Sequence, residues 1–182
     1  MRIIGGTYRG KKLFTPSSDN IRPTSDRTRE AIFNILRSRL GSNFSQFKLV
    51  DLFCGTGAFS LEAISQGFSL VCSVDIDTTL IQKNASLFPN ETNKIKIIKA
   101  DATRKIPTNT KFDVLFMDAP YNKGLSSKAL INIIPNLSSG AICLIETHKD
   151  ETIDLPLNFS VIDKRKYGTA QIIIVQFLGQ LS

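Results

Sequence analysis

A glycine turn is the first feature of the chain with recognisable chemistry. Gly55 and Gly57 separate an apolar segment, 48–54, from a helical pattern at 58–66. Glycine lets the backbone come close to a ligand where a Cβ would collide. In open α/β sheets such turns lie at the carboxyl ends of the strands, where ligands bind. Asp51 precedes the first glycine by four positions. Its carboxylate would repel a pyrophosphate, and it suits the sulfonium and amino groups of S-adenosylmethionine.

Two more carboxylates follow the next two apolar segments. Asp75 comes 24 positions after Asp51, close to the spacing of about 20 at which an acidic residue binds ribose hydroxyls. Asp101 follows the third segment and would accept from the adenine amino group. Each alone also suits a helix N-cap or a solvated strand end, but three beside one glycine turn favour a ligand site. A nicotinamide site is disfavoured, because Ser60 stands where its third glycine is expected.

The fourth apolar segment leads into Asp118-Ala119-Pro120-Tyr121. A base amino group is a poor nucleophile, since its lone pair is delocalised into the ring. A carboxylate and a backbone carbonyl that each accept one N–H would localise the lone pair, and an aromatic ring would stack on the base for about 1–3 kcal/mol. Asp118 and Tyr121 supply these groups, and Pro120 stiffens the loop. The same residue types also form ordinary turns; the predicted cofactor turn nearby favours the catalytic interpretation.

The elements that would position these residues alternate between strand and helix. Before them we predict a hairpin over 1–14 and a helix that Ser25 or Asp26 caps and Gly41 ends. The strands are expected at 48–54, 69–76, 94–99, 112–117 and 141–147, the helices at 58–66, 78–88 and 126–134, and a closing antiparallel pair at 160–166 and 171–178. This order predicts a Rossmann-like α/β fold: a parallel sheet with one antiparallel C-terminal strand and helices on both faces.

The charge is concentrated at the N-terminus. Of the 23 basic and 16 acidic residues, nine basic and three acidic ones lie in 1–40, a balance of 9 − 3 = +6 out of a net +7. This asymmetry is typical of a polyanion-binding extension, here 1–40, attached to a nearly neutral catalytic domain, 41–182. A basic surface that only keeps the protein soluble is the alternative.

Composition excludes several other classes. No apolar run approaches the eighteen or so residues of a membrane span, and the N-terminus lacks the apolar core of a signal peptide. The three cysteines are far apart and there is one histidine, which argues against a zinc site or a disulfide framework. We therefore expect a cytoplasmic, monomeric protein without a metal.

Four segments together carry a family resemblance: 1–13, 22–34, 51–57 and the pair 167–168. On these the chain resembles the bacterial family that methylates guanine N2 in 16S ribosomal RNA of the small subunit. The resemblance implies a class I methyltransferase fold with S-adenosylmethionine as cofactor. It implies 16S RNA as substrate, in the small subunit or its assembly intermediate. It also places the R-P-T segment over the cofactor, which adds Thr24 to the cofactor-binding residues. It brings the basic N-terminus to the RNA, with Arg9, Lys11, Lys12 and Arg22 as RNA-binding residues.

The chain departs from the family pattern at one catalytic position. The family tetrad resembles Asp/Asn-Pro-Pro-Tyr/Phe, and its second position here is Ala119. That member contributes mainly a backbone carbonyl and a restricted φ, which alanine adopts at some entropic cost. We expect a slower or looser site. Two alternatives stay open: amino-group methylation of another target, such as adenine in DNA or RNA or a protein amide, and a catalytically weak RNA-binding assembly factor.

Overall fold

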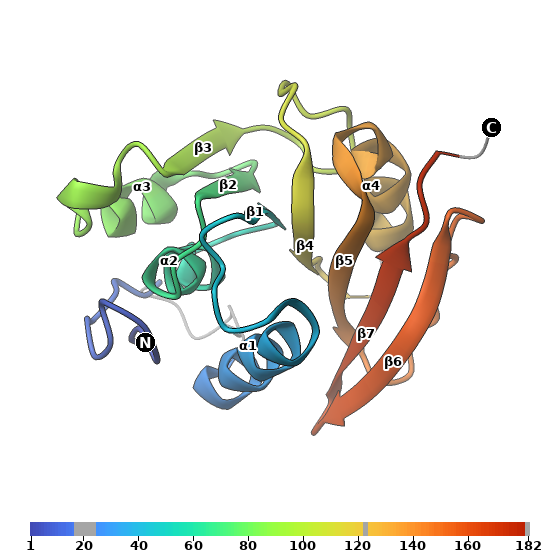
Figure 1. Cartoon of the computed structure of the whole chain (residues 1–182), viewed down its shortest axis with the longest axis horizontal. Coiled ribbons are helices and arrows are strands. Elements are labelled where there is room, and N and C mark those ends of the chain that lie inside the picture. Colours follow the sequence, from blue (N-terminus) through green and yellow to red (C-terminus); the bar gives the residue numbers. More distant parts are fainter. Residues whose placement is uncertain (17–24, 122–123, 181–182) are drawn as a thin grey trace.

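The protein, seen in a computed structural model, is described over residues 1–16, 25–121 and 124–180. In this part of the chain a seven-stranded sheet has the order β3-β2-β1-β4-β5-β7-β6 (Figure 1). The strands are β1 (Lys48–Leu52), β2 (Leu70–Asp75), β3 (Ile95–Lys99), β4 (Phe112–Asp118), β5 (Leu137–His148), β6 (Phe159–Tyr167) and β7 (Ala170–Phe177). The helices are α1 (Asp26–Leu40), α2 (Ala58–Ser65), α3 (Thr79–Ala85) and α4 (Leu125–Ile133), with 3-10 turns η1 (Pro89–Glu91) and η2 (Ile134–Asn136).

The sheet is mixed, as the sequence predicts. β1 to β5 pair in parallel, whereas β7 pairs antiparallel with both β5 and β6. β7 is therefore the strand that runs against the others, because a tight turn with Gly168 at φ +63° joins it to β6 and no crossover helix lies between them. The hairpin brings the end of β6 back to the carboxyl edge of β5.

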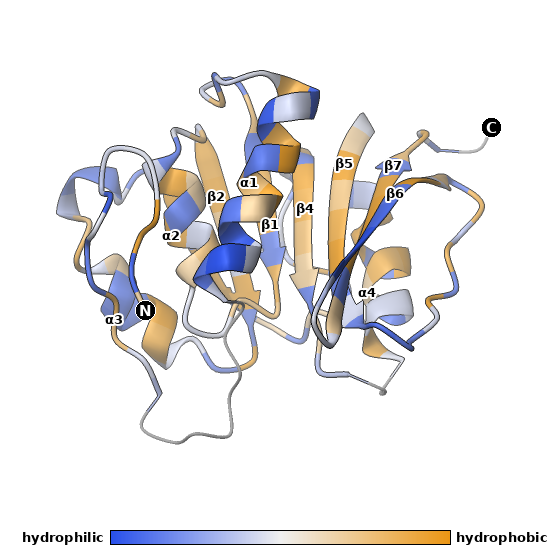
Figure 2. Ribbon diagram, turned by 90° about the horizontal axis from the view of Figure 1, so that it is seen from below, coloured by the Kyte–Doolittle hydropathy of each residue, from blue (hydrophilic) through white to orange (hydrophobic). Residues whose placement is uncertain are grey.

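Helices cover both faces of the sheet (Figure 2). On one face α1 and α2 pack against alternate residues of the strands, in a core that includes Phe33, Phe59 and Phe116. On the other face α4 packs Leu130 and its neighbours against the intervening strand residues. Because both faces are covered, the central strands read as continuous apolar runs. Within the described ranges, no helix is both long and apolar enough to cross a membrane.

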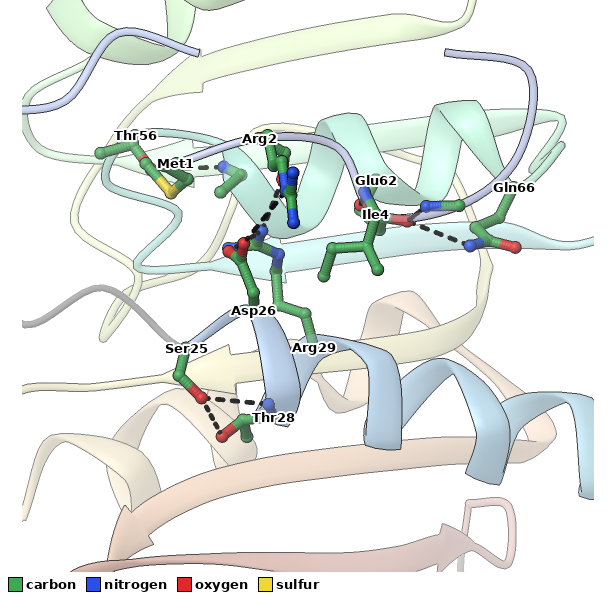
Figure 3. Close-up of polar contacts among 12 residues, drawn as sticks. Met1, Arg2, Ile4, Ser25, Asp26, Thr28, Arg29, Thr56, Glu62 and Gln66 are labelled. Carbon is green, nitrogen blue, oxygen red and sulfur yellow. Dashed lines mark hydrogen bonds and ion pairs between the residues drawn. The ribbon is translucent and has the colours of Figure 1, made fainter. Parts of the chain in front are cut away.

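The N-terminal segment forms a bent hairpin with a single bridge, between Arg2 and Lys12. Its apolar residues Ile3 and Leu13 are buried in a cluster shared with α2 and α3. The Glu62 carboxylate on α2 accepts the backbone N–H groups of Ile4 and Gly5 at 2.7 and 2.8 Å (Figure 3). Residues 1–14 are therefore held against the domain, as is α1, whose apolar face contributes to the central core.

Candidate active site

A cavity of about 760 Å³ opens at the carboxyl ends of β1, β2, β4 and β5. Its walls come from the glycine turn, the 118–121 loop, the start of α1 and the turn between β6 and β7. Ser25, which lines it, caps α1 by accepting the Thr28 N–H at 3.1 Å (Figure 3). The structure thus brings the predicted cofactor turn and the predicted catalytic loop to the same cavity.

The cavity is lined by the carboxylates Asp51, Asp75, Asp118 and Glu146, one from each of four neighbouring strands. Side chains alternate between the two faces along a strand, and the pairing register gives these four positions the same face of the sheet. The residues two positions earlier include Leu49, Phe116 and Leu144, which are buried in the core under α1 and α2. The sequence interpretation missed Glu146. A lone acidic residue near the end of the apolar stretch 141–147 was the signal that would have found it.

The two glycines of the turn have different roles. Gly55, at φ +51°, lines the cavity and donates its N–H to the Asp75 carboxylate at 2.8 Å. A Cβ on Gly57 would lie 1.8 Å from Cδ1 of Ile81, so this glycine is required where α3 packs against the turn. Gly57 is not among the described residues that line the cavity. Its predicted contact with the cofactor therefore stays a prediction.

Asp51 is 1% exposed and lies at the bottom of the cavity. It accepts from the backbone N–H and the hydroxyl of Ser60, at 3.1 and 2.6 Å. Burial raises the pKa of Asp51 to about 7; the Ser60 hydrogen bonds oppose the shift, and the charges of Asp118 and Asp75 add to it. A bound cation would favour its ionised form, so the residue fits the amino or sulfonium group proposed for it.

Asp75 and Asp101 differ in their surroundings. Asp75 ends β2 beside the glycine turn, and its second carboxylate oxygen accepts the Asp77 N–H at 3.0 Å. Asp101 accepts from the N–H and hydroxyl of Thr103, at 2.9 and 2.6 Å, and this hydroxyl holds its pKa below the ordinary value. Asp101 is absent from the described lining of the cavity. Its carboxylate stabilises the turn after β3, and its contact with adenine stays a prediction.

The 118–121 loop lies at the cavity wall. Asp118 is half-buried and pairs in parallel register with Glu146. Ala119 is 3% exposed and belongs to the core on the α4 side, whereas Pro120 is exposed. The Tyr121 ring meets the ring of His148 edge to face, with centroids 5.9 Å apart. The three predicted catalytic residues therefore share one wall of the cavity.

The predicted RNA-binding residues are not equivalent. Arg9 and Lys12 are exposed. The Lys11 ammonium lies 4.7 Å from the centre of the Phe88 ring and donates to the Leu87 carbonyl, so it stabilises the packing of the hairpin. Thr24 and Arg22, predicted for the cofactor and the RNA, lie outside the described residues.

Three cations at the cavity were missed by the sequence interpretation: Arg27, Arg29 and Lys166. Arg29 is 1% exposed; it pairs with Asp26 and donates to the Arg2 carbonyl, each at 2.8 Å (Figure 3). These residues come from α1 and from the end of β6. Among the described residues, no three His, Cys, Asp or Glu side chains are grouped to hold a metal ion.

Comparison with known sequences places this arrangement in a family. Residues 1–176 match the family described as Conserved hypothetical protein 95. The "Ribosomal RNA small subunit methyltransferase D" of Haemophilus influenzae is 28% identical over 184 residues, covering 97% of this chain and 93% of the relative. The "Putative rRNA methyltransferase YlbH" of Bacillus subtilis is 34% identical over 191 residues, covering 98% and 100%.

The comparison of folds agrees. A solved structure described as "Putative methyltransferase yhhF from Escherichia coli" matches with a TM-score of 0.80 at 27% identity, over 99% of each chain. The predicted class I methyltransferase fold is confirmed, and so is the resemblance to methyltransferases of the small-subunit ribosomal RNA. The chain belongs to the family described as Conserved hypothetical protein 95.

Proposed function

We propose that the protein transfers a methyl group from S-adenosylmethionine to the exocyclic N2 amine of a guanine in 16S ribosomal RNA. It acts as a monomer in the cytoplasm, on the small subunit or its assembly intermediate. The observation that carries the proposal is one cavity, lined by both the Gly55 turn and the 118–121 loop. The names of its relatives, ribosomal RNA methyltransferases, support the RNA substrate.

The residues of the turn fit the cofactor. Asp75 would bind the ribose hydroxyls, and Asp51 would face the amino group of the methionine part. Gly55 leaves its N–H and backbone close to the ligand. Asp101 and Thr24 are proposed for the adenine end, with Gly57 shaping the turn. When bound, S-adenosylmethionine supplies a methyl group on a sulfonium sulfur, which is a good leaving group.

The loop residues activate the acceptor. Asp118 accepts one N–H of the guanine amine, and the Ala119 carbonyl accepts the other, so the nitrogen lone pair points toward the methyl group. Tyr121 stacks on the base, which must leave its helix to reach the cavity. As the nitrogen–carbon bond forms and the carbon–sulfur bond breaks, the amine loses a proton to Asp118 and then to solvent. Pro120 restricts the loop in this geometry.

The test compares methyl transfer to three substrates: naked 16S RNA, small subunits from a strain lacking the protein, and double-stranded DNA. We expect transfer to one or both RNA substrates, with N2-methylguanine as the product found by mass mapping. Preferential methylation of DNA, or of adenine in any substrate, would exclude the guanine assignment. If no substrate is methylated, a catalytically weak RNA-binding assembly factor becomes the better description.

Two substitutions separate chemistry from cofactor binding. Asp118→Ala should abolish turnover and leave the affinity for S-adenosylmethionine mostly unchanged, because this residue orients the acceptor. Asp75→Ala should weaken cofactor binding by about 1–3 kcal/mol, the usual cost of ligand hydroxyls left unpaired. Calorimetry measures the cofactor affinity of both variants, and the methyl-transfer assay measures their turnover. Glu30→Gln, at an exposed position on α1, is the matched control. Equal affinity of Asp75→Ala and wild type would remove Asp75 from the site.

A further inference from the structure

We propose that Glu146 selects guanine by accepting the N1–H of the target base while Asp118 accepts from its N2 amine. The inference rests on the proposed function and deepens it. Glu146 is 5% exposed and lines the same cavity as the 118–121 loop. It would contact the substrate as a specificity-determining residue.

The register of the sheet sets the two carboxylates side by side. Asp118, the last residue of β4, is the parallel partner of Glu146 on β5. Neighbouring strands lie about 4.8 Å apart, and paired residues point to the same face. The donors N1 and N2 of guanine are both bonded to C2 and are neighbouring donor groups along one edge of the base. Two acceptors on adjacent strands therefore match two adjacent donor groups.

Adenine differs from guanine at one of these two positions. It presents an N–H donor at N6 and a bare acceptor at N1, so one of the two carboxylates would face a lone pair. Guanine presents N1–H and N2–H₂, both donors, on its Watson–Crick edge, which proteins read when a base is splayed out. A second carboxylate thus favours guanine and at the same time repels adenine.

The surroundings of Glu146 increase this selectivity. Its partner on β7 is Ile172, which is fully buried, and Glu146 itself is 5% exposed. Water therefore has little access to its carboxylate. In such surroundings a donor or acceptor left without its partner costs far more than it does in water, and sites built to pair with one group reject analogues that lack it.

The test uses 2-aminopurine, which keeps the N2 amine but has an acceptor at N1 in place of the N–H. It is placed in 16S RNA at the position that the wild type methylates, and kcat/KM is compared with that for guanine. The wild type should prefer guanine by about tenfold to hundredfold. Glu146→Gln should reduce this preference at least about tenfold, because its amide can donate to N1 of 2-aminopurine.

Controls separate selectivity from folding. Glu30→Gln should keep the wild-type preference, and Asp118→Asn should lower kcat on both bases without changing their ratio. Glu146→Asp, which keeps a carboxylate, should lose rate and keep the preference for guanine. Melting temperature and cofactor affinity show whether each variant is folded. If Glu146→Gln is not, folded Glu146→Ala is measured in its place, and an unchanged ratio between the two bases in that variant would overturn the assignment.

The outcomes also separate this inference from the proposed function. If the wild type methylates guanine and folded Glu146→Gln keeps an unchanged ratio between the two bases, only the Glu146 assignment is overturned. If the wild type methylates no guanine in any RNA, the proposed function and the assignment both fail.

Discussion

Asp51 is the residue whose protonation we expect to respond to binding of the proposed cofactor. Burial raises its pKa to about 7, so in the free protein the protonated form is populated at neutral pH. A bound ammonium or sulfonium favours the carboxylate, and binding therefore releases a proton below pH 7. We predict that affinity for S-adenosylmethionine rises with pH from about 5 to 7 and that Asp51→Asn removes this rise. Calorimetry across this range, in buffers of different ionisation enthalpy, measures both affinity and proton release.

The raised pKa of Asp51 also affects folding stability, which it makes fall with pH, whereas cofactor affinity rises with pH. In the unfolded chain Asp51 loses its proton near pH 4, whereas in the folded protein without cofactor it keeps the proton to about pH 7. The folded state therefore binds more protons between these values, so the contribution of Asp51 to stability falls as pH rises from about 4 to 7 and is constant above. The affinity for S-adenosylmethionine tests the first effect: if it does not change between about pH 5 and 7, the proposed contact of Asp51 with the cofactor is wrong.

Ala119 is the second single residue for which we predict an effect, here on turnover. We predict that Ala119→Pro preserves or raises turnover, because proline fixes φ in the loop that carries Asp118 and Tyr121. The site is 3% exposed, so the ring must also fit the core on the α4 side. Turnover on small subunits, measured together with the melting temperature, separates the two effects. Lower turnover at an unchanged melting temperature would contradict the prediction.

The residues that the sequence identified were those whose neighbours in the chain carry a local signal. Asp75, Asp118 and Gly55 each follow an apolar run, and all line the cavity. Glu146 and Lys166 lie within strands β5 and β6, and only the pairing of β4, β5, β7 and β6 brings them to the cavity. Such neighbours depend on the order of strands in space, which the spacing of residues along the chain does not contain.

At the scale of elements, hydrophobic pattern predicted which segments form strands but not where each ends. The predicted segment 141–147 corresponds to β5, which spans Leu137–His148. The strand begins earlier because Phe112 already pairs with Leu137, and the register of β4 and β5 then shifts before Val114 pairs with Ile142. The helix predicted at 78–88 ends at Ala85, and a 3-10 turn begins at Pro89. Boundaries of this kind depend on pairing and packing partners, which are distant in the sequence.

Gly57 shows how one element constrains another, and it gives a prediction at this scale. Gly57→Ala should destabilise the fold, since φ is +74° and the new Cβ would meet Ile81 on α3. Gly124→Ala is the matched control: its φ of +60° and ψ of 17° are close to the +74° and 15° of Gly57, and a Cβ there has no neighbour within 4 Å among the described residues. Left-handed strain costs about 1–2 kcal/mol at either site, and overpacking adds about 1–3 kcal/mol at Gly57 only.

Urea unfolding measures this difference. The Gly57→Ala variant should have the lower midpoint, with a slope close to that of the control. Equal loss of stability in the two variants would mean that α3 moves without cost and that the packing explanation of Gly57 is wrong.

At the scale of the whole molecule, the basic N-terminal segment differs from the rest in charge but is packed against the same domain. The N-terminal segment carries much of the positive charge, yet it is bound to α2 through Glu62 and buries Ile3 and Leu13. In Figure 1 this segment lies beside α2 and α3, at the end of the sheet opposite β6. Because α1 shares the core of the domain, residues 1–40 do not form a separate folding unit, and the division at residue 40 stays a prediction about function.

The last prediction tests whether this segment contacts RNA phosphates. Arg9→Ala combined with Lys12→Ala should weaken binding to 16S RNA and reduce the slope of log affinity against log salt by up to about 1.5, the value for two phosphate contacts. Both side chains are exposed and held by a folded hairpin, so the loss should not alter cofactor affinity.

Two controls complete the experiment. Lys96→Ala with Lys105→Ala removes the same charge from a separate pocket, which Lys48 at the start of β1 and Leu70 at the start of β2 also line. This control should leave the salt slope nearly unchanged. Lys11→Ala should lower the melting temperature and leave RNA affinity nearly unchanged, because the Lys11 ammonium packs against Tyr8 and Phe88. If both double variants reduce the slope equally, RNA binding follows net charge alone, and the N-terminal segment has no special place in it.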